Sequence, residues 1–600
     1  MCGIYGQIAD LPESTLIDNA HLAIEVLSHR GPDGKGIAHG RGYCLGHRRL
    51  AIFDTSALGA QPMTAWGHTV VFNGAIYNWE ELRRELETGG YSFRSRTDTE
   101  VVLAAYDKWG TGCFRRFNGM WAMAIVTPAE AKVVLSRDRF GIKPLYYSLS
   151  GGLTFASEPG VVATHANHQA AVNRQVAAEF IRYGWQDHRP ESLYTDVLQL
   201  APGHYATASL QETNTLQLTS FYDLDGATAL ASVGNTRNEA ELRLRELLND
   251  SVRLRSRSDV GRCITLSGGI DSSSIAGILA THAQIRPLTF SALFPGDPLD
   301  ESPYVEAVCE HHHLRNLALT PTYEEVMNEY AATQFAQGQP IASLAVVAHY
   351  QLMRAIHASG ERVLLNGQGA DEIGAGYDKF YLPYFREAIR RRPWSGVENL
   401  ARYFTQQPID VGKTFSRLAK LAAQSLEREN PVTGPYFDGA ETAAFKRGRD
   451  VDVRTTSINL IREVGLPVLL RHEDRNTMAF GIESRAPFMD HRVVEHLLAM
   501  PDEWKIHRAV RKNAIREACR DVLPTKVYNR YKKLGFPTPA TTWMEGDAGR
   551  YLDRIREGCR LGYFSSTLSN HCAWIMRKKQ RNQYDLVFRC FSWVEFMKSA

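Results

Sequence analysis

The feature that most limits the fold is a glycine-rich turn near the middle of the chain, Ser267-Gly268-Gly269-Ile270-Asp271-Ser272-Ser273. It follows the short apolar run Cys263–Leu266 and precedes a helical pattern over Ser272–His282. Strand and helix patterns then alternate up to a second such turn, Asn366-Gly367-Gln368-Gly369-Ala370-Asp371-Glu372. This alternation predicts an α/β domain with a parallel sheet, whose ligands bind at the carboxyl ends of the strands. Both turns lie at such ends.

The first turn has the chemistry of a phosphate-binding loop. Glycines let backbone N–H groups approach an anion, and the start of the next helix adds partial positive charge. Asp271 is placed to hold Mg²⁺ beside the phosphates. The turn is not a Walker A loop, because no Gly-Lys-Ser/Thr follows at the required spacing.

Length and charge narrow the class of protein. A chain of 600 residues is too long for one core and predicts at least two domains. The net charge of +3 comes without a block of like charge, so we expect no nucleic-acid partner. No run of about 18 apolar residues occurs, so we expect no membrane span, and the start does not resemble a signal peptide.

Cysteine usage indicates a compartment. The nine cysteines are scattered without a CxxC pair, which predicts a reducing, cytoplasmic location and argues against disulfides and zinc. We also expect no metal role for His311-His312-His313, which lies on a helical stretch.

The chain divides by pattern into two parts. Up to about residue 210, short strand patterns such as Arg49–Phe53 are interrupted by a few helical stretches, which predicts an α+β layered domain. We place this domain at residues 2–215, a small, polar linker at 216–238 and the second domain at 239–600. After about residue 385 the second domain is expected to be mostly helical.

Cys2 is a candidate nucleophile. Removal of Met1 would give it a free α-amino group with a pKa of about 7.7–8.0, so one residue would supply nucleophile and base. Taken alone, Cys2 is better explained as an ordinary buried cysteine. Segments elsewhere supply what an amide hydrolase for a free amino acid needs: an asparagine and a glycine N–H for an oxyanion, an arginine for the α-carboxylate and an aspartate for the α-ammonium.

From Cys2 to about Glu158 the chain resembles the class II glutamine amidotransferase domain, in the version found in glutamine-hydrolysing asparagine synthetases. The resemblance implies a layered αββα fold of the Ntn-hydrolase type, Cys2 as nucleophile, and Asn73 with Gly74 as oxyanion hole. It implies that glutamine is bound by Arg49, Leu50, Ala51, Ile52, Phe53, Asn73, Gly74, Ala75 and Asp98. The family usually has Glu at the position of Ala75, which puts the affinity for glutamine in question.

The second part resembles the synthetase domain of the same family, an N-type ATP pyrophosphatase. The implied ATP and pyrophosphate contacts are Thr265, Leu266, Ser267, Gly268, Gly269, Asp271, Ser272, Ala292, Asn366 and Gly367. Gln368 and Asp371 would contact the intermediate, Asp271 and Asp371 would hold Mg²⁺, and Lys512 would stabilise charge on the phosphates or on the tetrahedral intermediate. The charged segment Glu473-Asp474-Arg475-Asn476 also matches, and we expect it to hold the domain together.

The implied activity is the ATP-dependent amidation of a carboxylic acid through an acyl-adenylate, with glutamine as ammonia donor and AMP and pyrophosphate as products. Aspartate is the default acceptor by resemblance, and the family also implies a homodimer. Three departures keep another acid in specialised metabolism open: Gln368 stands where the best-known aspartate enzymes carry Glu, Gln339–Leu344 departs from their substrate loop, and the helical stretch 386–465 is long.

Two further readings compete with this one. A cyclase similar to β-lactam synthetase is less favoured, since those relatives typically lose the nucleophilic cysteine that this chain keeps as Cys2. A silent regulator that binds ATP or glutamine is disfavoured by the intact Cys2, Asp98, Asp271 and Lys512.

Overall fold

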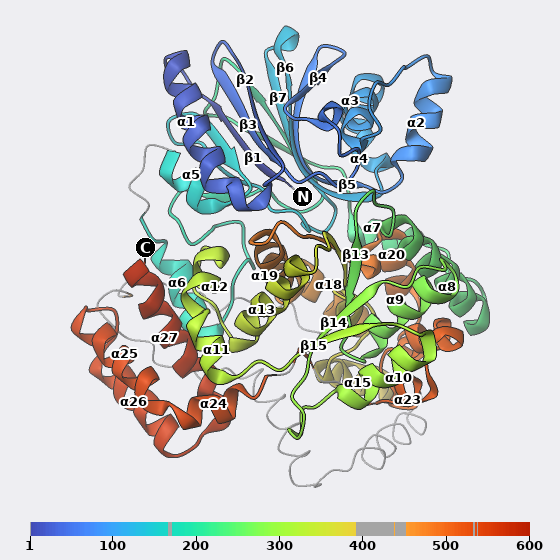
Figure 1. The fold of residues 1–600 in the computed structure, drawn as a ribbon, viewed down its shortest axis with the longest axis vertical. Coiled ribbons are helices and arrows are strands. Elements are labelled where there is room, and N and C mark those ends of the chain that lie inside the picture. Colours follow the sequence, from blue (N-terminus) through green and yellow to red (C-terminus); the bar gives the residue numbers. More distant parts are fainter. Residues whose placement is uncertain are drawn as a thin grey trace.

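Two six-stranded antiparallel sheets stack face to face in the N-terminal part of the computed structural model, which describes residues 2–165, 171–391, 437, 452–531, 535–536 and 538–599 (Figure 1). The first sheet has the order β10-β8-β9-β1-β3-β2, with β1 (Gly3–Ile8), β2 (Gly34–Gly40), β3 (Tyr43–Arg49), β8 (Tyr146–Ser148), β9 (Leu153–Ala156) and β10 (Leu198–Gln199). The second has the order β12-β11-β7-β6-β5-β4, with β4 (Met63–Ala65), β5 (His68–Ile76), β6 (Gly119–Thr127), β7 (Lys132–Arg137), β11 (His204–Ser209) and β12 (Gln217–Ser220).

Helices cover the outer faces of both sheets. The helices α1 (Glu13–Val26) and α5 (Pro159–His165) pack on the first sheet, and α2 (Trp79–Thr88), α3 (Asp98–Trp109) and α4 (Cys113–Arg116) pack on the second. Because β6 is covered on both faces, its sequence GMWAMAIVT is apolar almost throughout rather than alternating. The four layers confirm the predicted αββα architecture.

One strand prediction is wrong. The strand β3 ends at Arg49, and residues 50–53 form a loop. Their apolar pattern has another cause, because this loop is buried against the second half of the chain: the Asp259 N–H donates to the Ile52 carbonyl at 3.2 Å, and the Arg485 guanidinium lies over the Phe53 ring.

A five-stranded parallel sheet organises the second half, as predicted. Its order is β15-β14-β13-β16-β17, formed by β13 (Arg262–Thr265), β14 (Leu288–Ala292), β15 (Asn316–Leu319), β16 (Val363–Leu365) and β17 (Glu483–Arg485). The chain winds outward in both directions from the central pair β13 and β16, so this pair is the topological switch point where ligands of such sheets bind. Both glycine-rich turns begin here, one directly after each strand.

Helices lie on both faces of this sheet. The inner residues of α13 (Leu344–Ala358) pack on one face, while α8 (Arg237–Arg255) and α9 (Ile270–Thr281) pack on the other. Further helices surround it: α7 (Leu224–Leu230), α10 (Ser302–His312), α11 (Tyr323–Asn328), α12 (Tyr330–Gln337), α14 (Ala370–Ile373), α15 (Tyr381–Arg391), α18 (Val453–Arg462), α19 (Leu466–Met478), α20 (His491–Ala499), α21 (Asp502–Lys505), α22 (Asn513–Ala518) and α23 (Thr525–Tyr528). On α10, the His312 ring donates through Nε2 to the Val522 carbonyl at 2.8 Å.

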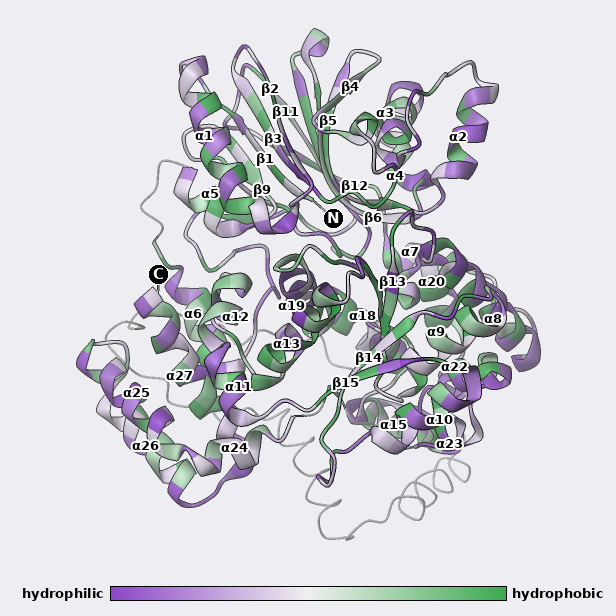
Figure 2. Cartoon of the chain, in the orientation of Figure 1, coloured by the Kyte–Doolittle hydropathy of each residue, from purple (hydrophilic) through white to green (hydrophobic). Residues whose placement is uncertain are grey.

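The chain ends in a helical cluster, which confirms the expected helical C-terminal part. It consists of α24 (Ala540–Gly546), α25 (Ala548–Arg560), α26 (Ser566–Arg577) and α27 (Tyr584–Ser599). The helix α27 returns to α6 (Arg174–Tyr183), where Arg589 donates to the Ile181 carbonyl at 3.0 Å (Figure 1). Buried apolar residues pack between the two stacked sheets and inside this helical cluster. Figure 2 marks the apolar residues of each element in green.

The segment 216–238, predicted as a linker, contains β12 and α7, and the domain limits at 215 and 239 remain predictions. Most of the predicted helical stretch 386–465 lies outside the described residues, and only its ends belong to α15 and α18. No helix in the described part of the chain is long and apolar enough to cross a membrane.

Candidate active sites

A small cavity lies where the N-terminal end of β1 and the C-terminal half of β5 face the second half of the chain. It is lined by Cys2, Arg49, Leu50, Ile52, Phe53, Gly59, Gln61, Phe72, Gly74, Thr97, Asp98, Thr99 and Glu483. Seven of the residues predicted to handle glutamine are in this set, and Asn73 lies beside it in β5. Ala51 and Ala75 are not lining residues.

Cys2 and Asn73 are in direct contact across the two stacked sheets. The Cys2 backbone N–H donates to Asn73 Oδ1 at 3.0 Å. The Asn73 amide nitrogen Nδ2 is buried and has no hydrogen-bond partner among the described residues. A buried donor without an acceptor is costly, so this nitrogen is preorganised for a ligand oxygen. Burial raises the pKa of the Cys2 thiol.

Arg49 and Asp98 supply opposite charges in the same cavity. The Arg49 guanidinium donates to the Ser56 carbonyl at 2.7 Å and also to the Asp54 carbonyl, which fixes the side chain. Asp98 begins α3 and accepts from the Ile76 N–H at 2.9 Å. Burial raises the pKa of Asp98 to about 6, although that hydrogen bond works in the other direction. The pair matches the two charged groups of a free amino acid.

Glu483 was missed as a residue of this cavity. It lies in β17, an edge strand of the parallel sheet, and accepts from Arg485 Nε at 2.6 Å. Burial opposes ionisation, yet Arg485 holds the pKa of Glu483 below its ordinary value. The sequence carries no signal for this placement, because the burial of Glu483 and Arg485 becomes visible only in the structure.

An ionic cluster joins this cavity to the second half of the chain. Arg30 donates to the Cys2 carbonyl at 3.3 Å and pairs with Asp474 of α19 at 2.9 Å and with Glu158 at 3.2 Å. Arg475 of α19 pairs with Glu158 at 2.5 Å, and Lys143 lies 3.4 Å from Asp474. The segment Glu473–Asn476 was predicted to hold the structure together, and the contacts of Asp474 and Arg475 agree with that role.

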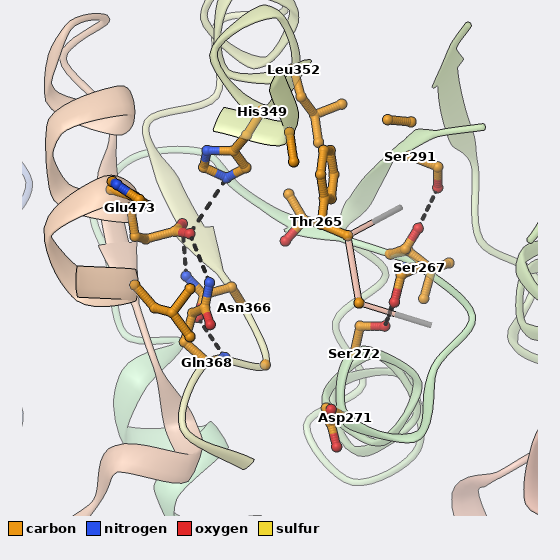
Figure 3. A pocket seen from close by; sticks show the side chains of 18 of the residues that line it. Thr265, Ser267, Asp271, Ser272, Ser291, His349, Leu352, Asn366, Gln368 and Glu473 are labelled. Carbon is orange, nitrogen blue, oxygen red and sulfur yellow. Dashed lines mark hydrogen bonds and ion pairs between the residues drawn. The ribbon is translucent and has the colours of Figure 1, made fainter. Parts of the chain in front are cut away.

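A larger cavity of about 410 Å³ opens at the switch point of the parallel sheet (Figure 3). Its walls include most of the residues predicted for ATP and the intermediate: Thr265, Leu266, Ser267, Asp271, Ser272, Ala292, Asn366, Gly367, Gln368 and Asp371. Gly268 and Gly269 lie in the turn between Ser267 and Asp271. Gly268 has a φ of +63°, and a Cβ there would lie 2.5 Å from the Tyr304 Cβ, so the turn requires glycine.

Lys512 joins the two predicted metal ligands. Its Nζ lies 2.6 Å from Asp271 Oδ2 and 2.6 Å from Asp371 Oδ1. The two carboxylates, one from each glycine-rich turn, therefore converge on one point beside the phosphate loop. Mg²⁺ is usually held by one or two carboxylates together with substrate phosphates. The donor set fits this ion.

Cations line a second hollow on the far side of the loop. It is lined by Ser267, Gly269, Ile270, Asp271, Gly376, Arg511, Lys512, Arg516, Arg530 and Tyr531. Arg530 is fixed by donation to the Gly268 carbonyl at 3.1 Å. Of the four cations, sequence reasoning singled out Lys512 alone, because the arginines carry no local motif.

The wall opposite the phosphate loop is polar. In Figure 3, Glu473 of α19 points into the cavity beside Asn366, Gln368 and His349. Its Oε1 accepts from Asn366 at 2.8 Å and from Ser484 at 2.9 Å. Glu473 was expected to be structural, like its two neighbours, but it lines the cavity.

Known proteins match both halves. Residues 1–222 match the glutamine amidotransferase domain family, and residues 243–580 match the asparagine synthase family. Glutamine-hydrolysing asparagine synthetase 1 of Bacillus subtilis (strain 168) is 28% identical, over 96% of this chain and 93% of its own length. A putative glutamine-hydrolysing asparagine synthetase of Mycobacterium tuberculosis is 29% identical, over 92% and 89%. The amidase chry2 of Gibberella zeae is 25% identical, over 90% and 88%. With an amidotransferase domain followed by a synthase domain that spans more than half of its length, the chain belongs to the asparagine synthase family.

Proposed function

We propose that this chain takes ammonia from glutamine and joins it to a carboxylic acid that ATP has activated as an acyl-adenylate, with aspartate as the default acceptor. The observation that carries the proposal is the pairing of two sites in one chain. One cavity combines Cys2 with a cation and an anion, Arg49 and Asp98, and the other combines a phosphate loop with Lys512 and two convergent carboxylates.

In the first site, the Cys2 thiol attacks the glutamine amide carbon. Because burial raises the thiol pKa, a base is needed, and the α-amine exposed by removal of Met1 would serve. The Nδ2 of Asn73 and the Gly74 N–H would stabilise the oxyanion. Arg49 would bind the α-carboxylate and Asp98 the α-ammonium. The products are a glutamyl thioester on Cys2 and ammonia.

In the second site, the acceptor carboxylate attacks the α-phosphorus of ATP and pyrophosphate leaves. The N–H groups of the turn after β13 and the nearby Lys512 would carry the phosphate charge, and the arginine-lined hollow would receive pyrophosphate. Asp271 and Asp371 would hold Mg²⁺, which supplies further charge neutralisation when bound. Ammonia then displaces AMP from the acyl-adenylate.

The separation of the two sites can be tested with Cys2→Ala. We expect this variant to lose amide formation with glutamine and to keep it with added ammonium, because the synthetase cavity contains no group from Cys2. Amide product is measured with each nitrogen donor, and intact mass shows whether active wild type lacks Met1. Loss of both activities would contradict separate sites, and a retained Met1 in active enzyme would exclude the α-amine as base.

The acceptor can be identified by acid-dependent pyrophosphate release. We expect release with aspartate, and we expect Asp271→Asn to abolish it because one of the two convergent carboxylates is lost. A panel of larger carboxylic acids tests the alternative that the amidase relatives raise, namely amidation in specialised metabolism. Silence with aspartate together with release for a larger acid would replace the default acceptor.

A further inference from the structure

The wall of the synthetase cavity opposite the phosphate loop carries the side chain of Glu473 (Figure 3). This side chain is buried on α19, and its two oxygens have different surroundings. Oε1 is fixed by Asn366 Nδ2 at 2.8 Å and Ser484 Oγ at 2.9 Å. Among the residues that the structure describes, Oε2 has two longer contacts, with His349 Nε2 at 3.4 Å and Gln368 Nε2 at 3.4 Å. One oxygen is therefore anchored, and the other remains suited to a further partner.

Gln368 and His349, the two neighbours of Oε2, cannot serve as proton acceptor in its place. Gln368 presents an amide, which is not basic, and the Gln368 amide N–H points at Oε2. His349 meets Oε2 with Nε2, so a proton on that nitrogen would lie between the two groups. The remaining carboxylates that line this cavity are Asp271 and Asp371, which are joined by Lys512, and Glu301, which pairs with Arg530.

We propose that Glu473 is the catalytic base of the amide-forming step, with His349 as a positioning residue. The proposal rests on the acyl-adenylate chemistry proposed above. The lone pair of ammonia forms the C–N bond at the acyl carbon, and the carbonyl π electrons move to oxygen. Oε2 of Glu473 takes one proton from the positively charged nitrogen. The tetrahedral intermediate then collapses, and the bond to the phosphate oxygen breaks so that AMP leaves with the electron pair.

This assignment gives the departure at Gln368 a structural counterpart. Where the best-known aspartate enzymes of the family carry Glu, this chain has an amide, and a carboxylate from a different element lies one hydrogen bond away. In this chain the carboxylate at this point of the cavity comes from α19, and the Gln368 amide contacts it.

The test uses the full chain with ammonium as nitrogen donor, so that glutamine hydrolysis does not limit the rate. Two readouts are compared for Glu473→Gln with the accepted acid: exchange of labelled pyrophosphate into ATP, and amide product. We expect exchange to persist, because acyl-adenylate formation does not need the base, and amide formation to fall by about 10²–10⁴-fold. Glutamine hydrolysis by the same variant controls for folding.

A second variant separates chemistry from architecture. In Glu473→Gln/Gln368→Glu the carboxylate is moved to the neighbouring position, and we expect part of the lost amide formation to return. A merely structural Glu473 would not be rescued in this way.

The outcomes are distinguishable. Amide formation at the wild-type rate in Glu473→Gln, parallel loss of exchange, or absence of rescue would overturn the assignment of Glu473 while leaving the acyl-adenylate step in place for the wild type. Absence of exchange in wild type with every acid would overturn the acyl-adenylate step, and the role of Glu473 with it.

Discussion

At the scale of one residue, the burial of Asp98 determines the pH range in which the site can bind an amino acid. It is buried at the start of α3, and burial raises the pKa of its carboxyl to about 6. A protonated Asp98 has no charge with which to bind an α-ammonium group. The affinity for glutamine should therefore be full above pH 7 and should fall by about tenfold per pH unit below 6. We expect calorimetry on Cys2→Ala, which binds without turnover, to show this dependence.

The matched variant is Asp98→Asn in the same background. It should bind glutamine weakly at every pH between 5 and 8, with a flat profile. If Asp98→Asn shows the same pH dependence of glutamine binding as the protein with Asp98 intact, a group other than Asp98 titrates.

Asn73 provides a second prediction at this scale. Its Nδ2 is buried beside Cys2 with no partner in the described structure. Asn73→Ala should lower kcat for glutamine hydrolysis by about 10²–10³-fold, as removal of one oxyanion donor does elsewhere. Ammonium-dependent amide formation should be unchanged. Asn214→Ala, in an exposed turn between β11 and β12, is the control and should leave both rates near wild type.

Single residues were predictable from sequence where a motif carried them. Cys2, Arg49, Gly74 and Asp98 meet in one cavity as expected, because the strands and turns that carry them belong to one fold. Glu483 was not predicted to lie there. It enters the cavity from a different sheet, and no spacing along the chain reports that contact.

At the scale of one element, α19 explains why Glu473 was also missed. Successive helical residues project about 100° apart, as follows from 3.6 residues per turn. Glu473 therefore faces the synthetase cavity, while Asp474 and Arg475 face the ionic cluster beside Cys2. In the sequence these residues form one continuous charged segment. Only the packing around the helix shows that they have two different roles.

The turn after β13 gives a prediction at the same scale. Gly268→Ala places a methyl group 2.5 Å from the Tyr304 Cβ and 2.8 Å from the Val305 nitrogen, on a backbone with φ of +63°. The turn must shift, so ATP affinity should fall by at least about tenfold, a cost of about 1.4 kcal/mol. Gly296→Ala is the control, because its φ is also positive, at +84°, but its Cβ would meet no atom within 4 Å. ATP binding by titration should separate the two, and equal losses would assign the effect to backbone strain alone.

At the scale of the molecule, the two sites are joined by α19 and β17. The helix contributes Glu473 to one cavity and Asp474 to the cluster that contacts Cys2, while β17 contributes Glu483 to the glutamine cavity. Both elements belong to the second half of the chain. The parallel sheet and its switch point were predictable from the alternation of strands and helices. The packing of the two halves was not, because it depends on buried charges that resemble surface charges in sequence.

The cost of opening this junction can be measured with Asp474→Asn. Asp474 is buried between Arg30 and Lys143, at 2.9 Å and 3.4 Å, so the variant leaves two buried cations with less negative charge. We expect a loss of about 3–5 kcal/mol, seen as a lower thermal unfolding midpoint. Glu85→Gln breaks an exposed pair with Arg116 of only 2.6 Å and should cost less than about 1 kcal/mol. Comparing the two variants tests whether burial, rather than a short distance, determines the stability that an ion pair contributes. Equal shifts of the unfolding midpoint in the two variants would contradict a role of burial.

The pH dependence of the unfolding midpoints of wild type and Asp474→Asn shows whether the Asp474 carboxylate stabilises the junction in its charged form. Burial alone would raise the pKa of Asp474, but Arg30 and Lys143 hold it below its ordinary value. A carboxyl with a lowered folded-state pKa stabilises the fold above its unfolded pKa of about 3.9, and that contribution is lost as the pH falls through the folded-state value. The difference in midpoint between wild type and Asp474→Asn should therefore be constant from pH 6 to pH 8 and should narrow only below about pH 4. A difference that already narrows between pH 8 and pH 6 would show that a group other than Asp474 controls the junction.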